Sequence, residues 1–303
     1  MGKSTRRTVL LIALATLPFS TILQGQGAQV RATVSTSLPH YMPAAQLTAQ
    51  VEVPGTDALS ELGDEWNRLF VQYQPGSRLI YVPKLTKEAV KDLQDGTRPM
   101  IITARDMTTE ELSAFQAKYG YMPMRIPVCL DATIVFVHQA NPLSSITMEQ
   151  LDAIYSKDRL GGAKAPVLLW SDLNVKGGLG KRSIQAYARA EGAATRDAFK
   201  TTVLLKGEYR QGILPRPDAA SLAEAVVTDE TGIAFGSMAS WYAGVKVLPI
   251  VPYKATDARF PTQENVTSSR YPMPRLYYAY VNRAPGKPLD PGVNEVLHLI
   301  LSQ

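Results

Sequence analysis

Three turns in this sequence combine glycine, hydroxyl and arginine residues in patterns that could bind a small anion. The first is Gly55-Thr56-Asp57, between a short apolar strand at 51–53 and a helical pattern that runs to Tyr73. Glycine lets a ligand approach the backbone closely, and a helix start offers N–H groups with a partial positive charge. The structural alternative is that Thr56 and Asp57 only cap the helix.

The other two turns each carry an arginine. Arg105 follows an apolar strand that ends at Thr103, where a guanidinium could bind an oxyanion through two N–H groups or pair with Asp106 at the surface. Arg189 begins a turn between two expected helices, near 183–190 and 196–205, in which Thr195 is the expected helix cap. The alternative for this turn is a capped turn with salt-bridged charges. The weaker candidates for ligand contacts in the three turns are Gly55, Thr103 and Ala193.

The sequence offers little for other chemistry. Its one cysteine, Cys129, excludes an internal disulfide and a multi-cysteine metal site, and it lies within an apolar strand-like run. There are three histidines, and no Ser/His or Cys/His turn accompanies them. The segment 177–182 looks like a phosphate loop but lacks its first glycine and its final Ser or Thr. We therefore expect no catalytic residues, no metal site and no cofactor.

The N-terminus is typical of an exported protein. Lys3, Arg6 and Arg7 precede an apolar run at 8–23, and small residues follow at 25–28. This layout predicts a signal peptide at 1–28, whereas the short run and its proline argue against the alternative, a membrane anchor. Removing the three cations reduces the formal charge from +5 to +2, with no Lys/Arg block, which disfavours nucleic acid as a partner. We expect a tether at 29–48 and a periplasmic or secreted protein.

Strand-like and helix-like runs alternate from Val51 onward, including an expected strand at 167–170. Thr108-x-x-Glu111 and Thr147-x-x-Gln150 are capping boxes that predict helix starts. With 303 residues, 45% of them hydrophobic, the chain can form one large or two modest domains. The alternation predicts an α/β fold with mainly parallel sheets flanked by helices, whose ligands bind at the carboxyl ends of strands. Because no linker separates two sequential domains, we expect two lobes joined by crossing strands.

Several segments stand in an order that carries a family resemblance. They are Gly55–Leu59 with Trp66, Ala104–Met107, Asn141–Leu143 with Ile146-Thr147, Trp170–Leu173, and Tyr271–Met273 through Asn282. This order resembles the PstS-like phosphate-binding proteins of ABC importers, within the type II periplasmic binding proteins. The resemblance implies a two-lobed fold with a hinge of crossing strands. Lobe I would comprise 49–133 and 266–303, and lobe II 134–265.

The resemblance also implies a ligand and the residues that bind it. Phosphate or a related oxyanion would be held between Thr56, Asp57 and Arg105 of lobe I and Arg189 and Thr195 of lobe II. A carboxylate that accepts the proton of the ligand would favour hydrogen phosphate over sulfate. The implied protein is a monomer without enzymatic activity that delivers its ligand to an ABC permease.

Three turns depart from the family pattern. Ala193-Ala194 replaces Ser-Gly, Ala104 replaces Ser, and residues 83–88 contain no glycine where the family has a Gly-Ser-Gly-rich turn. Each lost hydrogen bond to a charged ligand costs about 1 kcal/mol or more, so affinity could fall by several decades. One alternative is therefore a degenerate relative that acts as a sensor or binds another small ligand. The other is a hydrolase on the same scaffold, which the missing nucleophile and base disfavour.

Overall fold

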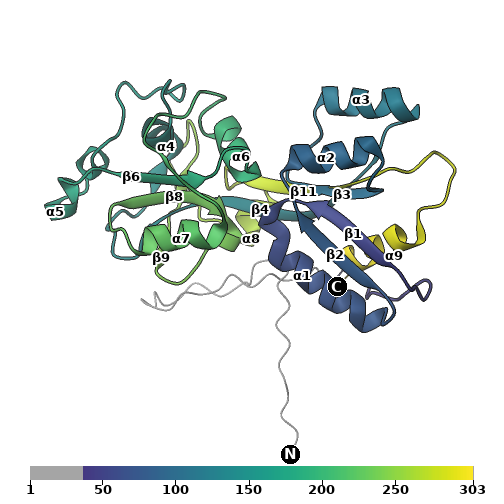
Figure 1. The fold of residues 1–303 in the computed structure, drawn as a ribbon. Coiled ribbons are helices and arrows are strands. Elements are labelled where there is room, and N and C mark those ends of the chain that lie inside the picture. Colours follow the sequence, from purple (N-terminus) through teal and green to yellow (C-terminus); the bar gives the residue numbers. More distant parts are fainter. Residues whose placement is uncertain (1–36, 303) are drawn as a thin grey trace, which may run out of the picture. The chain divides into compact units, whose positions relative to one another are not determined.

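The computed structural model describes residues 37–302, which form two compact units. Unit 1 contains residues 37–129 and 277–302, and unit 2 contains residues 130–276. The chain passes from unit 1 to unit 2 within β4 (Met124–His138) and returns within β11 (Pro274–Val281) (Figure 1). The signal peptide expected at 1–28 and the first part of the expected tether, 29–36, lie outside the described residues.

Unit 1 is a four-stranded sheet in the order β2-β1-β3-β11. Strand β1 is parallel to β2 and β3, and β11 is antiparallel to β3. Helices α2 and α3 lie on one face of this sheet, and α1 and α9 lie on the other (Figure 1). The elements are β1 (Gln50–Gly55), η1 (Asp57–Leu59), α1 (Ser60–Tyr73), β2 (Arg78–Pro83), α2 (Thr86–Asp95), β3 (Met100–Thr103), α3 (Thr109–Tyr119) and α9 (Pro291–Ile300).

The apolar spacing of the helices explains this packing. In α1, Leu62, Trp66 and Phe70 recur every four residues, so they share one face, and all three are buried. On the opposite face of the sheet, Phe115 of α3 belongs to a buried cluster that also contains residues of α2, β3 and β11. Thr108 caps α3 in the predicted capping box, which is confirmed.

The segment that precedes β1 is fixed to unit 1 by a buried carboxylate. Glu295 of α9 is 1% exposed and accepts hydrogen bonds from the Tyr41 hydroxyl (2.9 Å) and from the amides of Ala44 (3.1 Å) and Ala45 (3.2 Å). A buried carboxylate is stable only when it is well hydrogen-bonded, so these contacts hold the segment in place. This part of the expected tether at 29–48 is therefore an anchored part of the unit.

Unit 2 is built on a second sheet in the order β4-β8-β6-β7, with β9 paired to β4. Strand β6 is parallel to β7 and β8, whereas β4 is antiparallel to β8 and β9. A separate two-stranded parallel sheet joins β5 and β10. The elements are β5 (Ile146–Thr147), α4 (Met148–Tyr155), η2 (Trp170–Leu173), α5 (Gly177–Gly180), β6 (Gln185–Arg189), α6 (Ala194–Thr202), β7 (Leu214–Arg216), α7 (Ala219–Val227), β8 (Gly232–Ser237), η3 (Met238–Ser240), β9 (Val245–Val247), β10 (Ile250–Val251) and α8 (Gln263–Thr267).

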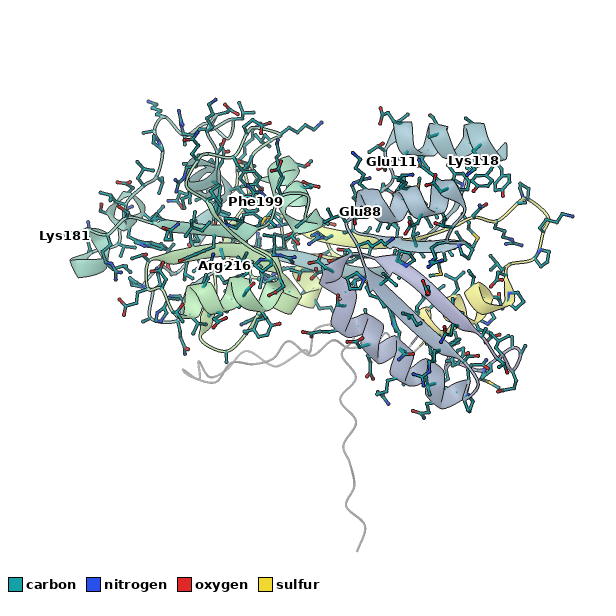
Figure 2. All side chains as sticks on the ribbon, viewed as in Figure 1. Glu88, Glu111, Lys118, Lys181, Phe199 and Arg216 are labelled. Atoms are coloured by element: carbon teal, nitrogen blue, oxygen red, sulfur yellow. The ribbon has the colours of Figure 1, made fainter. Side chains whose placement is uncertain are left out.

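Aromatic rings join α4 and α6 to one face of this sheet, and α7 covers the other face (Figure 1). The ring of Phe199 stacks on Phe235 at 3.7 Å, and Tyr155 contacts both rings edge-on. Figure 2 shows Phe199 within the body of unit 2, whereas Lys181 projects from the end of α5. Helix α6 is thereby held against β8, which fixes the position of its first turn.

Two expected elements of unit 2 are wrong. Residues 183–190 contain the strand β6 rather than a helix, and residues 167–170 form no strand beyond an isolated bridge between Leu169 and Ser183. Residues Ala186–Arg189 are all buried between β7 and β8, so they show no alternation of polar and apolar residues. Alanine favours helix locally, but pairing with two parallel neighbours overrides that preference. The turn after Arg189 is therefore a strand-to-helix turn.

The two-unit α/β organisation with two chain crossings is as expected, but the boundaries differ. The sequence indicated changes of lobe after residues 133 and 265, whereas the units divide after residues 129 and 276. The Thr133 amide donates to the Met273 carbonyl (2.9 Å), and the Tyr271 hydroxyl donates to the Thr133 carbonyl (2.8 Å). These contacts keep the start of β11 in unit 2.

Candidate anion-binding site

Arg189 is the last residue of β6 and lies at the carboxyl end of parallel strands. It is 7% exposed, and its Nη2 donates to the Pro217 carbonyl over 2.6 Å. Its own carbonyl accepts a hydrogen bond from Arg196 Nη1 over 2.9 Å. Ligands of open α/β sheets bind outside the carboxyl ends of the strands, so this guanidinium stands at the expected edge of the sheet.

Helix α6 begins directly after this turn, and two backbone amides at its start are free to donate hydrogen bonds. Its N-cap is Ala193 rather than the expected Thr195, and Ala193 provides no side-chain hydrogen bond. Within residues 37–302 the amides of Ala194 and Thr195 have no acceptor. Such amides carry the partial positive charge of a helix start and can bind an anion.

A third residue of this region was missed by the sequence reasoning. Arg275, near the start of β11, is 5% exposed, and its Nη1 donates to Thr195 Oγ1 over 3.0 Å. Thr195 lies in the first turn of α6 and is 3% exposed. We call Arg189, Thr195 and Arg275 the basic cluster, in which Arg275 contacts Thr195 directly and Arg189 is joined to α6 through the hydrogen bond from Arg196 to its carbonyl. The sequence did hold a signal for Arg275, since this arginine directly precedes the apolar run 276–281 and lies in the same strand. An arginine buried in this way is rare unless it has a partner.

A stacked pair fixes the start of α6 beside this cluster. The Arg196 guanidinium lies 4.6 Å from the centre of the Tyr209 ring, and the Tyr209 hydroxyl donates to the Arg196 carbonyl (2.8 Å). Burial raises the pKa of Tyr209, so this hydroxyl keeps its proton at neutral pH. Because Arg196 also binds the carbonyl of Arg189, the pair ties the helix to the end of β6.

The turn after β1 in unit 1 is organised by a tyrosine. The Tyr81 hydroxyl donates to the Thr56 carbonyl over 2.7 Å, and its oxygen would lie 2.3 Å from a Cβ at position 55. Gly55 therefore makes room for the Tyr81 ring. Thr56 is buried and caps η1 through a long contact of 3.5 Å from the Ala58 amide. Thr56 thus has the role that the structural alternative gave it, as a helix cap.

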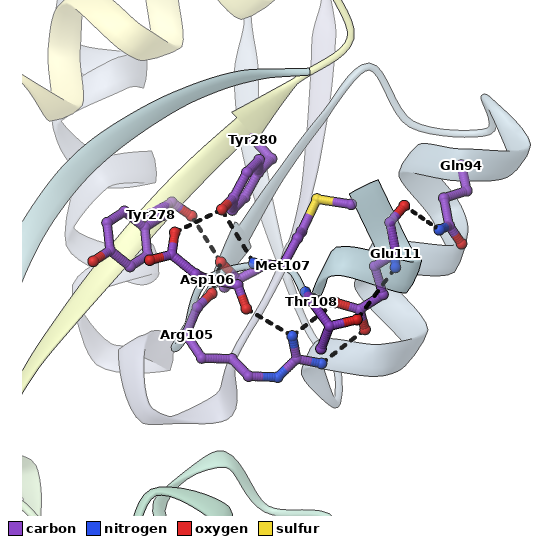
Figure 3. Close-up of polar contacts among 9 residues, drawn as sticks. Gln94, Arg105, Asp106, Met107, Thr108, Glu111, Tyr278 and Tyr280 are labelled. Atoms are coloured by element: carbon purple, nitrogen blue, oxygen red, sulfur yellow. Dashed lines mark hydrogen bonds and ion pairs between the residues drawn. The ribbon is translucent and has the colours of Figure 1, made fainter. Parts of the chain in front are cut away.

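In the turn after β3, the arginine pairs with a glutamate of the following helix. Arg105 donates to both carboxylate oxygens of Glu111 on α3, at 2.7 and 2.8 Å (Figure 3). The hydroxyl of Thr103 donates to the Arg105 carbonyl over 2.8 Å and closes the turn. Burial alone would raise the pKa of Glu111, but the hydrogen bonds from Arg105 and Thr108 lower it. The expected surface partner of Arg105 was Asp106; the structure pairs the guanidinium with the Glu111 carboxylate, and Nη1 also donates to the backbone carbonyl of Asp106 (2.8 Å).

Asp106 belongs to a separate contact. It pairs with Arg125, which lowers the pKa of the Asp106 carboxyl, and it accepts a hydrogen bond from the Tyr280 hydroxyl (2.8 Å). Burial, with a contribution from Asp106, raises the pKa of Tyr280 to about 12. The Tyr280 hydroxyl also accepts from the Met107 amide (3.1 Å), so it holds the backbone of this turn on β11 (Figure 3).

Sequence comparisons identify the family. The model of the PBP superfamily domain matches residues 42–303. The phosphate-binding protein PstS of Pseudomonas aeruginosa is 32% identical over 290 residues, which cover 96% of this chain and 90% of the relative. The chain belongs to the PstS-like solute-binding proteins of the PBP superfamily. Protein SphX of Synechococcus elongatus is 25% identical over 261 residues, covering 84% of this chain and 75% of the relative.

Solved structures of phosphate-transport proteins share the fold. One from Clostridium perfringens, described as a phosphate ABC transporter substrate-binding protein with bound phosphate, is 18% identical with a TM-score of 0.67 and covers 82% of this chain and 92% of its own. An ABC-type phosphate transport receptor from Vibrio cholerae is 18% identical with a TM-score of 0.63, covering 84% and 94%. The expected fold class is thereby confirmed.

Two kinds of feature are absent from the described residues. Within 37–302, no group of three or more His, Cys, Asp or Glu side chains is arranged to hold a metal ion. In the same range no helix has the length and apolar character needed to cross a membrane, and the longest, α1, has 14 residues. The polar chemistry that unit 2 gathers at the start of α6 consists of N–H and O–H donors, which suit an anion.

Proposed function

We propose that this protein is an exported solute-binding protein that captures phosphate or a related oxyanion for an ABC importer. Membership of the PstS family supports the ligand class and the importer. The proposal includes the absence of enzymatic activity, a monomeric state and a periplasmic or secreted location after removal of a signal peptide. The partner would be an ABC permease.

The basic cluster is the observation that carries this proposal. An oxyanion that leaves water needs several donors, and this part of unit 2 combines two guanidinium groups, one hydroxyl and the amides at the start of α6. All three cluster side chains are buried, where low polarity strengthens charge–charge attraction. A hydrogen bond to a charged group contributes about 1.5–3 kcal/mol, so a few such bonds support micromolar or tighter binding.

Thr56, Asp57 and Arg105 of unit 1 are proposed as further contacts on the strength of the family resemblance. Arg105 would bind an anion in competition with Glu111, because both oxygens of that carboxylate accept its N–H groups. Gly55, Thr103 and Ala193 are the weaker candidates. Of these, Gly55 and Thr103 have structural roles in their turns.

Calorimetry of the purified mature protein tests the proposal. We expect phosphate to bind with a 1:1 stoichiometry, sulfate and molybdate to bind more weakly, and small organic acids to give no heat. Arg259→Ala serves as a control and should bind phosphate as the wild type does, since Arg259 is an arginine of unit 2 that pairs with Asp257 at the surface. Binding of an organic acid in preference to every oxyanion would overturn the proposal.

A second candidate function is sensing with weakened anion binding. The observation that favours it is the α6 cap, where Ala193 offers no side-chain donor and Ala194 follows it. With fewer charge-assisted hydrogen bonds to the anion, phosphate would bind more weakly than the importer proposal expects. Genes for a permease and an ATPase beside this one would favour import, and their absence together with weak binding would favour sensing.

A further inference from the structure

The contact between Arg275 and Thr195 joins two distant parts of the chain inside unit 2. Arg275 Nη1 donates to Thr195 Oγ1 over 3.0 Å across 80 residues of sequence, and both side chains are buried. A hydroxyl has one hydrogen and two acceptor positions. When Arg275 occupies an acceptor position, the hydrogen of Thr195 has to point elsewhere.

Another threonine of the same helix uses its hydroxyl in a different way. Thr201, in the last turn of α6, donates its hydroxyl hydrogen to the Asp197 carbonyl four residues earlier (3.0 Å). This is the usual arrangement for threonine within a helix. Thr195 lies in the first turn, and within residues 37–302 its hydroxyl hydrogen has no acceptor. Its hydrogen is therefore available for an acceptor that is not part of the described chain.

We propose that Arg275 is a positioning residue of the anion site. It fixes the Thr195 hydroxyl as a hydrogen-bond donor to the bound anion, and its buried charge adds to the attraction. This inference rests on the proposed function and assigns a role to a residue outside the five ligand contacts that the resemblance implies.

The role explains how the site can work without the missing hydroxyl at position 193. A hydroxyl that rotates freely loses entropy when it binds an anion, whereas a fixed donor has already lost that freedom. Because Ala193 and Ala194 supply no hydroxyl, Thr195 is the only hydroxyl residue in the 193–195 segment. Its orientation then determines a larger share of the affinity.

A double-mutant cycle with phosphate calorimetry tests the role. Arg275→Met removes the donor and the charge while it keeps most of the side-chain volume, and Thr195→Val removes the hydroxyl. We expect Arg275→Met to weaken phosphate binding about a hundredfold in the wild-type background but only about tenfold beside Thr195→Val, since only the loss of charge remains there. Thr195→Ser keeps the hydroxyl and should retain the hundredfold effect. Arg259→Met is the matched control and should leave the phosphate affinity unchanged in both the wild-type and the Thr195→Val background.

The outcomes separate this inference from the proposed function. If wild-type protein binds no oxyanion, the proposed function fails. If wild type binds phosphate but Arg275→Met costs the same factor with and without the Thr195 hydroxyl, Arg275 acts without positioning Thr195 and the inference is overturned. Should Arg275→Met fail to fold by circular dichroism, Arg275→Lys replaces it, with an expected loss of about tenfold in wild type and less than twofold beside Thr195→Val.

Discussion

The turn after β3 in unit 1 and the turn after β6 in unit 2 look alike in sequence but treat their arginines differently. Each places an arginine at the carboxyl end of a buried strand and shortly before a helix: Arg105 follows β3, and Arg189 is the last residue of β6. The Arg105 side chain is 37% exposed and its guanidinium binds Glu111, whereas Arg189 is buried and belongs to the basic cluster. The residue types and spacing do not distinguish these two arginines.

The third residue of the following helix makes the difference. In α3 this position holds Glu111, which completes the capping box and accepts both N–H groups of Arg105. In α6 it holds Arg196, a second cation, which donates to the Arg189 carbonyl. The turn after β3 is thus closed by a carboxylate of its own helix. In the turn after β6, the third residue of the helix is a cation, and the carboxylate near Arg189 is that of Asp218, the N-cap of α7. The third residue of the following helix is therefore a carboxylate that neutralises the preceding arginine in α3, and a second cation in α6.

The largest expected effect is the loss of Arg189. Arg189→Ala should weaken phosphate binding by at least a hundredfold, because an anion bound in a buried site would lose its guanidinium partner, at a cost of about 2–5 kcal/mol. Arg105→Ala, the matched change in the other turn, should weaken it by less than about tenfold. Calorimetry of both variants measures the ratio, and equal losses would remove the distinction between the turns.

Exchanging the deciding residue should convert one turn into the other. Arg196→Glu places a carboxylate at the position that Glu111 has in α3, where it would compete with the anion for Arg189. We expect phosphate binding to weaken by about a hundredfold, and Arg196→Gln to weaken it by less than about fivefold, since Gln adds no negative charge. A loss in Arg196→Gln that equals the loss in Arg196→Glu would show that the Tyr209 stacking, and not the charge, matters.

Restoring a hydroxyl should tighten phosphate binding in only one of the two turns. Ala193→Ser should tighten phosphate binding by about tenfold, near the scale of one charge-assisted hydrogen bond. Since Ala193 is the N-cap of α6, the same change should also raise the free energy of unfolding by about 1 kcal/mol. Ala104→Ser is the matched control in unit 1 and should leave the affinity within about twofold. Calorimetry and urea unfolding measure the two quantities, and an unchanged affinity in Ala193→Ser would exclude a direct contact at this position.

The smallest expected effect is on acid stability through Glu111. Its pKa is lowered from the ordinary value of 4.5, so its ion pair stabilises the folded state above that pH and loses this contribution as the pH falls through the folded-state pKa. Glu111→Gln should lower stability by less than about 1 kcal/mol at pH 7, because Arg105 is partly exposed, and should flatten the pH dependence below 4.5. Urea unfolding from pH 3 to 7 measures this, and an unchanged slope below pH 4.5 would contradict the pairing.

The sequence predicted the elements that carry local signals. The capping boxes at Thr108 and Thr147, the amphipathic helix at 60–73 and the two-lobed α/β class are all confirmed. Strand β6 was mistaken for a helix because a strand buried on both faces has no alternating pattern, and its neighbours β7 and β8 come later in the chain.

The site was predicted only in part for a similar reason. Arg189 and Thr195 lie close together in sequence, so a local motif could point to them. Arg275 lies 80 residues after Thr195 and reaches it only because β11 begins in unit 2. The pairing of Arg105 with Glu111 follows from α3 and was available from the capping box, but the box was read only as a helix start.

A crystal structure of the protein with arsenate, measured at the arsenic absorption edge, tests the central claim most directly. Arsenate has the shape and charge of phosphate, and its anomalous signal locates the anion without ambiguity. We predict one strong peak within hydrogen-bond distance of Arg189, of the Thr195 hydroxyl and of the amides at the start of α6. A peak bound to Arg105 in place of Glu111, with none at the start of α6, would contradict the assignment of anion binding to the basic cluster.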